Sequence, residues 1–188
     1  MILITLPAVF LQFRWRQPVI VLQLITIIFF IAVIVRHHIF FMLQLTKIFH
    51  FEMAHAIHGY PGACKNIHGH SYELHVSVGI SNASNYFIPE PGFILDFKQI
   101  KELIKAFVIS NFDHKLVLSN HFLAEHPECC NHENLVKWEV EPSVENMLIF
   151  IQRTLVTKLP AGITLAELKL YETADSYARW VNTTMVYY

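Results

Sequence analysis

FHFEMAHAIHGYPGACKNIHGHSYELHVSV, residues 49–78, is the stretch that decides the fold. Apolar and polar residues alternate at both of its ends, as they do in half-buried strands, and a turn rich in glycine and proline separates the two ends. His55 ends the first strand-like run, and His68 and His70 open the second. Because strand side chains alternate between faces, His68 and His70 project from the same side of an extended chain.

A third histidine from a neighbouring strand would complete a set of three nitrogen ligands and leave one tetrahedral position open. This arrangement is typical of a catalytic zinc rather than a structural one. His55, His68 and His70 all share the parity of the apolar residues in their strands, so each is expected on a covered face. An unsatisfied imidazole is costly there, and a metal would satisfy it. The alternative is three core histidines that are satisfied by other partners.

The composition favours one domain with an appendage and gives no sign of a nucleic-acid partner. The chain has 188 residues and a net charge of -1, with 54% apolar residues concentrated before residue 44. Three cysteines, Cys64, Cys129 and Cys130, are an odd number with one adjacent pair, which argues against a disulfide framework. A reducing compartment, the cytoplasm, is therefore expected. Cys64 is a candidate reactive thiol, with a small buried hydrophobic residue as the alternative.

The N-terminal region, residues 1–41, is an apolar extension to a domain expected at residues 42–188. Residues 19–35 read VIVLQLITIIFFIAVIV without a charge, slightly short of the roughly 20 residues that a membrane span needs. One interpretation is an N-terminal membrane anchor. The other is that translation begins at Met42 and that residues 1–41 are upstream sequence. We favour the second, because Met42 falls immediately before the first strand of a self-sufficient domain.

The remaining pattern predicts an α+β fold in which an antiparallel sheet carries two helices on one face. Residues 115–134 are expected to be irregular, and residues 135–140 to form a short strand-like piece. The main strands are expected at residues 44–55, 70–80, 163–172 and 176–188, and the helices at residues 96–111 and 142–160. Glu172 shares the covered parity of the third main strand. It needs either a Lys or Arg partner or a ligand with paired N–H donors.

Six motifs occur in an order that resembles one known family. They are FHFEMAH, CKNIHGHSY, GFILDF, FDHKL, PSVEN and LYET, and they span residue 44 to the C-terminus. Together they are similar to the 6-pyruvoyl-tetrahydropterin synthase family, which includes the bacterial 6-carboxy-tetrahydropterin synthases. The three residues between Cys64 and His68 resemble the bacterial carboxy branch. The resemblance implies a tunnelling fold (T-fold) of order ββααββ.

The resemblance also assigns roles to single residues. It places zinc on His55, His68 and His70, the catalytic thiol on Cys64, an Asp-His pair on Asp113 and His114, and the pterin anchor on Glu172. The alternative for Asp113 and His114 is a cap at the C-terminus of the first helix. The family pattern implies a homohexamer, a dimer of trimers with active sites between subunits. Cys64 would then meet Asp113 and His114 across or near an interface.

By this resemblance the chain is a zinc-dependent lyase with a small-molecule substrate, 7,8-dihydroneopterin triphosphate. Its products would be 6-carboxy-5,6,7,8-tetrahydropterin, acetaldehyde and triphosphate, in 7-deazaguanine (queuosine) biosynthesis. One alternative is a 6-pyruvoyl-tetrahydropterin synthase, which eliminates triphosphate without cleaving a carbon–carbon bond. An alternative of another class is a membrane-tethered metal-binding protein without catalysis, which a fourth protein ligand on the metal would favour.

Overall fold

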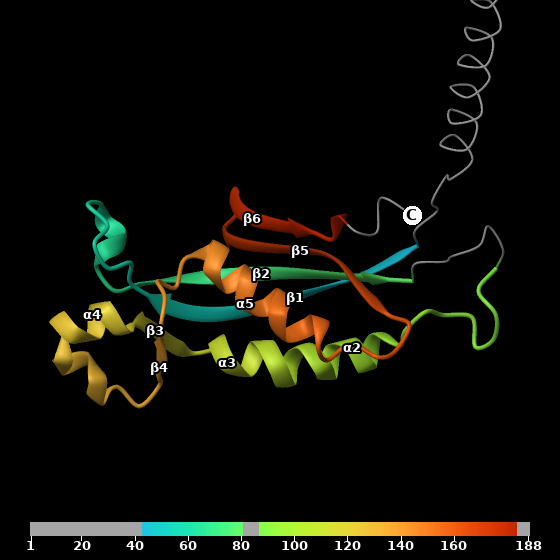
Figure 1. The fold of residues 1–188 in the computed structure, drawn as a ribbon, viewed down its shortest axis with the longest axis horizontal. Helices are drawn as coiled ribbons and strands as arrows, with labels where there is room; N and C mark the ends of the chain where they lie inside the picture. The colour runs from blue at the N-terminus through green and yellow to red at the C-terminus, as the bar shows by residue number, and fades with distance from the viewer. Residues whose placement is uncertain (1–42, 81–86, 184–188) are drawn as a thin grey trace, which may run out of the picture. The chain divides into compact units, whose positions relative to one another are not determined.

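The computed structural model describes residues 43–80 and 87–183, which fold into the α+β arrangement expected from the sequence (Figure 1). Within these residues six strands form one sheet in the order β4-β3-β1-β2-β5-β6. The strands are β1 (Gln44–His55), β2 (His68–Gly79), β3 (Lys115–Ser119), β4 (Leu135–Trp138), β5 (Thr164–Thr173) and β6 (Ser176–Val181). The helices are α2 (Phe97–Ile104), α3 (Ser110–Phe112), α4 (Asn120–Glu125) and α5 (Val144–Val156). A π-helical turn, η2 (Lys105–Ile109), joins α2 to α3, and the 3₁₀ turns are η1 (Ala63–Lys65) and η3 (Pro127–Asn131).

The longest pairing in the sheet is the antiparallel hairpin of β1 and β2. Gln44 pairs with Gly79 at one end, and His55 pairs with His68 at the other. Residues of β1 alternate between exposed and covered positions, as the sequence pattern predicts. The register therefore brings the end of β1 and the start of β2 together with the same face covered.

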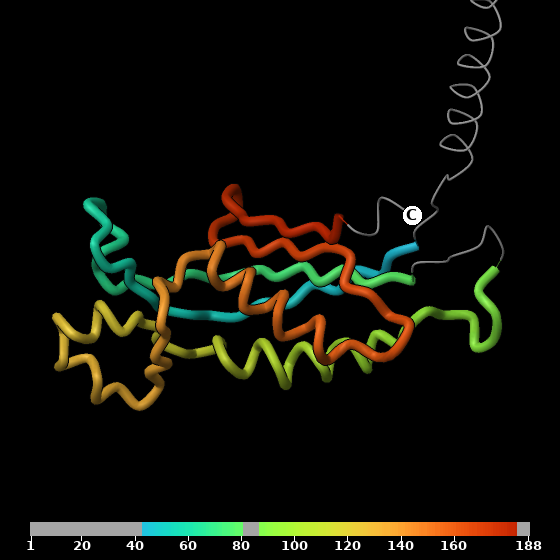
Figure 2. The backbone as a smooth tube through the Cα atoms, viewed as in Figure 1, coloured from blue at the N-terminus to red at the C-terminus, as the bar shows by residue number. Residues whose placement is uncertain are grey.

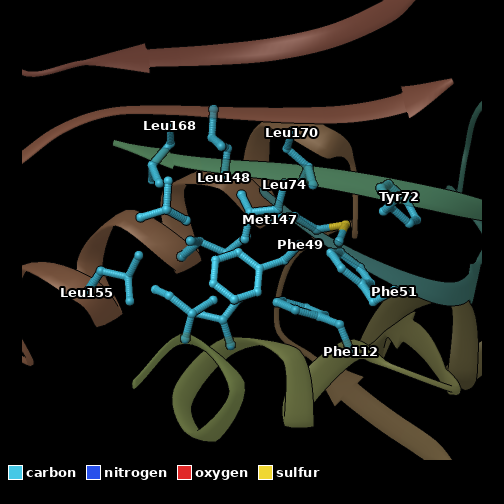
Figure 3. Packing of buried hydrophobic residues seen from close by; sticks show 14 of the residues in the cluster. Phe49, Phe51, Tyr72, Leu74, Phe112, Met147, Leu148, Leu155, Leu168 and Leu170 are labelled. Atoms are coloured by element: carbon cyan, nitrogen blue, oxygen red, sulfur yellow. The ribbon is translucent and has the colours of Figure 1, made fainter. Parts of the chain in front are cut away.

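The buried face of this hairpin packs against the helices. In Figure 3 side chains of β1, β2 and β5 meet those of the helices, among them Phe112 of α3 and Met147 of α5. The helix starts follow from their caps, because Asp96 accepts a hydrogen bond from the Lys98 N–H and Ser143 accepts one from Asn146. The two predicted helical regions are confirmed, and the first contains one π-helical turn.

The prediction of irregular structure over residues 115–134 was wrong. Lys115–Ser119 forms β3, which pairs parallel with β1 and with β4, so that the sheet is mixed rather than antiparallel. The strand is short but nearly continuously buried, a pattern that carries no alternation for a sequence reading to detect. It then turns directly into α4, because the Ser119 side chain accepts a hydrogen bond from the Phe122 N–H and caps the helix.

After β1 the chain turns, passes through η1 and enters β2, as the tube in Figure 2 shows.

The expectations for residues 1–41, including a membrane anchor at residues 19–35, lie outside the described residues. Across residues 43–80 and 87–183, no helix combines the length and the apolar character that a bilayer crossing requires.

Candidate metal centre and active site

Three imidazoles meet where β1 ends and β2 begins. His55 is the direct cross-strand partner of His68, and His70 lies two residues further along the same face. The ring centroids are 4.6 Å apart for His55 and His68, 5.3 Å for His55 and His70, and 4.9 Å for His68 and His70. Each ring offers one nitrogen, and these three atoms all lie within 4.8 Å of one another. The hairpin register thus produces the cluster that the sequence predicts.

Backbone carbonyls orient two of the three rings. Nδ1 of His55 donates a hydrogen bond of 2.7 Å to the carbonyl oxygen of Pro142, and Nδ1 of His68 donates one of 2.8 Å to that of Asn66. A carbonyl can only accept, so Nδ1 of each ring carries a proton, and in the neutral ring Nε2 then keeps its lone pair. This is the tautomer in which an imidazole binds a metal through Nε2.

Two ligand atoms of the cluster are buried without a hydrogen-bond partner in the described structure. They are the Nε2 atoms of His55 and His70. Burial lowers the pKa of both imidazoles, so neutral rings are favoured at neutral pH. A neutral ring with an unpartnered Nε2 is the form that metal binding requires, and the three residues therefore fit a metal ion.

Glu172, at the end of β5, faces this cluster. Its Oε1 lies 3.5 Å from Nε2 of His55 and 3.9 Å from Nε2 of His70. The same oxygen accepts a hydrogen bond of 3.0 Å from the hydroxyl of Tyr72. Within the described residues its close nitrogen neighbours are imidazoles, and no Lys or Arg within 4.0 Å fills the role of partner that one interpretation of the sequence offered.

The thiol of Cys64 is exposed, in the 3₁₀ turn η1 between the two strands. The loop is closed by a hydrogen bond of 2.8 Å from the Ile57 N–H to the Cys64 carbonyl oxygen. Exposure excludes the alternative of a small buried hydrophobic residue in this chain. In the described part of the chain, no hydrogen bond joins the thiol to the three imidazoles or to His114.

Asp113 and His114 form a turn after α3 that has a strained backbone and several hydrogen bonds to neighbouring segments. His114 has a φ of 59°, a left-handed conformation that is uncommon outside glycine. Its N–H donates to the Glu52 carbonyl oxygen at 2.7 Å, and Asn134 donates to its carbonyl oxygen at 3.0 Å. Asp113 accepts from the Glu52 N–H at 3.1 Å, and its carboxylate lies 2.9 Å from Nδ1 of His114. Such strain persists where surrounding contacts hold it, and it is common at functional sites.

An open cleft of about 450 Å³ joins these two groups. His70 from the imidazole cluster and His114 from the strained turn both contribute to its walls, together with Glu52, Ser71, Lys115 and Asn134. One monomer therefore brings a residue from each group to the same cleft.

Three contributors to the site have weak sequence signals. Tyr72 reads as a core residue, and the only hint is that a buried tyrosine hydroxyl needs a hydrogen-bond partner. Pro142 acts through its backbone carbonyl, which leaves no trace in the residue type. Asn134 lies in the stretch that was expected to be irregular, so nothing marked its contact with His114.

The fold and the site together define an α+β protein whose central hairpin holds three imidazoles in a metal-binding arrangement. Residues 44–182 match the family model described as 6-pyruvoyl tetrahydropterin synthase, and the chain belongs to this family. The resemblance seen in the sequence motifs is therefore confirmed.

Relatives with curated names agree with this placement. A protein of Rickettsia felis named 6-carboxy-5,6,7,8-tetrahydropterin synthase is 27% identical over 140 residues, covering 72% of this chain and 98% of the relative. A Haemophilus influenzae protein of the same name is 33% identical over 76 residues, covering 40% and 52% of the two chains.

Solved structures show the same fold at low identity. An uncharacterized protein from Wolinella succinogenes aligns with a TM-score of 0.62 at 18% identity, covering 76% of this chain and 99% of its own. The 6-pyruvoyl tetrahydropterin synthase of Caenorhabditis elegans aligns with a TM-score of 0.53 at 18% identity, covering 76% and 97%. The predicted T-fold is therefore confirmed.

Proposed function

We propose that this chain is a 6-carboxy-5,6,7,8-tetrahydropterin synthase of 7-deazaguanine (queuosine) biosynthesis. In this proposal it is a zinc-dependent lyase that converts 7,8-dihydroneopterin triphosphate into 6-carboxy-5,6,7,8-tetrahydropterin, acetaldehyde and triphosphate. The observation that carries the proposal is the cluster of three imidazoles, with candidate ligand atoms within 4.8 Å of one another, in a chain of this family. The names of the Rickettsia relatives favour the carboxy branch.

His55, His68 and His70 would hold the metal through nitrogen ligands. When bound, zinc would act as a Lewis acid toward side-chain oxygens of the pterin and stabilise negative charge that develops beside them. The protein's contribution is to hold the rings of His55 and His68 in one orientation, through the carbonyls of Pro142 and Asn66.

Cys64 would move protons on the substrate's carbon chain, with His114 as its partner. Proton shuttling needs a group that is accessible and able to ionise, and the Cys64 thiol is exposed. Asp113 would orient His114, since its carboxylate lies 2.9 Å from Nδ1 of that ring. Because both groups are exposed on this monomer, we propose that they meet in a homohexamer, a dimer of trimers with sites between subunits.

Glu172 would anchor the pterin. A carboxylate can accept two parallel hydrogen bonds from the guanidine-like edge of a pterin ring. Its partners within hydrogen-bond or ion-pair reach are a tyrosine hydroxyl and two imidazoles, so no cation among the described Lys and Arg side chains competes for it.

Residues 42–188 are proposed as the catalytic domain. The free thiols of Cys64 and Cys130 are exposed, which suits a reducing compartment, and we propose the cytoplasm.

The 6-pyruvoyl reaction is the second candidate, favoured by the name of the Caenorhabditis elegans neighbour. Product analysis separates the two reactions. The protein is incubated with 7,8-dihydroneopterin triphosphate, with and without a zinc chelator, and acetaldehyde and triphosphate are measured. The proposal requires equimolar release of both, lost with chelator and restored by zinc. Triphosphate without acetaldehyde would favour the 6-pyruvoyl reaction, and no turnover by zinc-loaded protein would refute both.

A further inference from the structure

Glu172 lies close to the place of a fourth metal ligand. In a tetrahedral zinc site with ligand bonds of about 2.0 Å, neighbouring donor atoms are about 3.3 Å apart. Oε1 of Glu172 is 3.5 Å from Nε2 of His55 and 3.9 Å from Nε2 of His70. A carboxylate this close to two of the three proposed ligands is a candidate fourth ligand for a metal held by these rings. Such a ligand would fill the position that a catalytic zinc keeps open for substrate.

The hydroxyl of Tyr72 acts on this same oxygen. It donates a hydrogen bond of 3.0 Å to Oε1 of Glu172. Tyr72 has 0% exposure, and its ring stacks on Phe51 with centroids 5.1 Å apart. In Figure 3 Tyr72 stands at the end of the core beyond Phe51. The donor is thus fixed in place.

We propose that Tyr72 is a positioning residue that holds Glu172 off the metal and reserves its carboxylate for the pterin. This inference rests on the proposed function for its catalytic consequence, but not for its effect on metal binding. The bond has a charged acceptor and a buried donor, and breaking it would leave the hydroxyl unpartnered. Swinging Glu172 onto the metal therefore has an opposing cost in the native protein.

Tyr72→Phe removes the hydroxyl and keeps the ring in the core. Without the hydrogen bond, Glu172 is expected to join the metal, so zinc affinity should rise by about tenfold. In the same variant kcat/KM should fall by about tenfold or more, because the open position and the pterin anchor are lost together. Zinc affinity is measured by competition with a chromophoric chelator, and turnover by acetaldehyde release.

Glu172→Gln in the otherwise native chain gives a second and independent test. If Glu172 is held off the metal, this variant should change zinc affinity by no more than about threefold, while turnover falls. A loss of about tenfold or more, the effect of removing a ligand or its close support, would show that Glu172 already binds the metal and would overturn the inference.

Tyr171→Phe is the matched control, since Tyr171 precedes Glu172 on β5 and its ring contacts Tyr177 and His75 instead. It should leave zinc affinity and turnover unchanged. Tyr72→Phe combined with Glu172→Gln should return zinc affinity to the native value. Unchanged or weakened zinc binding by Tyr72→Phe would overturn the inference. Because zinc titration needs no turnover, a native protein that releases no acetaldehyde would refute the proposed function alone.

Discussion

His55 at the end of β1 and Pro142 before α5 are joined by a buried hydrogen bond of 2.7 Å from Nδ1 to the carbonyl oxygen. This bond ties the central hairpin to a residue 87 positions further along the chain, just before α5. Asn146 in the first turn of α5 supports it, because its side-chain amide donates to the carbonyl oxygen of Glu141 at 2.9 Å. The capped end of α5 therefore sets the orientation of one proposed metal ligand.

Asn146→Ala should weaken zinc binding by about tenfold, the usual scale for the loss of a group that supports a metal ligand. Without the amide, the peptide before Pro142 is free to shift, and His55 loses its fixed orientation. Chelator competition measures the affinity. Asn111→Ala is the control. It also removes one side-chain hydrogen bond to a backbone carbonyl, but Asn111 lies in α3 and bonds to Phe107 instead. Equal zinc affinities in the two variants would contradict this role for Asn146.

Cys64→Ala should abolish acetaldehyde release while zinc content stays at the native level. The expectation follows from the proposed role of Cys64, an exposed thiol that would move protons without binding the metal. Cys130→Ala replaces another exposed thiol and should retain full activity. Loss of zinc from the Cys64 variant would instead make the thiol a metal ligand.

His114→Gly should raise the stability of the fold and remove its activity. The left-handed backbone at φ 59° costs a residue with a Cβ about 1 kcal/mol, which glycine avoids. His114→Ala lacks the imidazole as well but keeps the strain, so it should unfold at lower denaturant concentration than His114→Gly. Equal stability of the two variants would mean that the turn stores no strain.

The metal-free protein should lose stability as the pH falls below about 6.5, the ordinary pKa of histidine. Burial lowers the pKa of His55 and His70 in the folded state, so the unfolded chain binds more protons in this range. Their contribution is complete above pH 6.5 and is lost as the pH falls through the lowered pKa values. Denaturant midpoints across pH 5–8 measure it. His70→Asn should flatten the dependence, and an unchanged slope would contradict the assignment.

The parts of this fold that were predictable are those in which residue type and period carry the signal. Alternation in residues 44–55 identified β1, and the shared parity of His55, His68 and His70 identified the cluster. The helix starts expected near residues 96 and 142 agree with the N-caps that Asp96 and Ser143 form. In each case a local pattern and the tertiary structure require the same conformation.

The parts that escaped prediction depend on contacts between segments that are distant in sequence. β3 is nearly continuously buried, so its five residues show neither alternation nor helical period. Its parallel pairing with β1 is fixed by tertiary packing alone. The carbonyl of Pro142 and the hydroxyl of Tyr72 act at the site through atoms whose partners only the folded chain reveals.

The zinc stoichiometry of three purified proteins tests the central claim most directly. The native chain should bind one zinc per monomer, and His68→Ala should lose it. His75→Ala should keep it, because His75 lies on the other face of β2 and bonds to Glu73 instead. Full zinc binding by the His68 variant, or none by the native protein, would contradict a metal centre built from His55, His68 and His70.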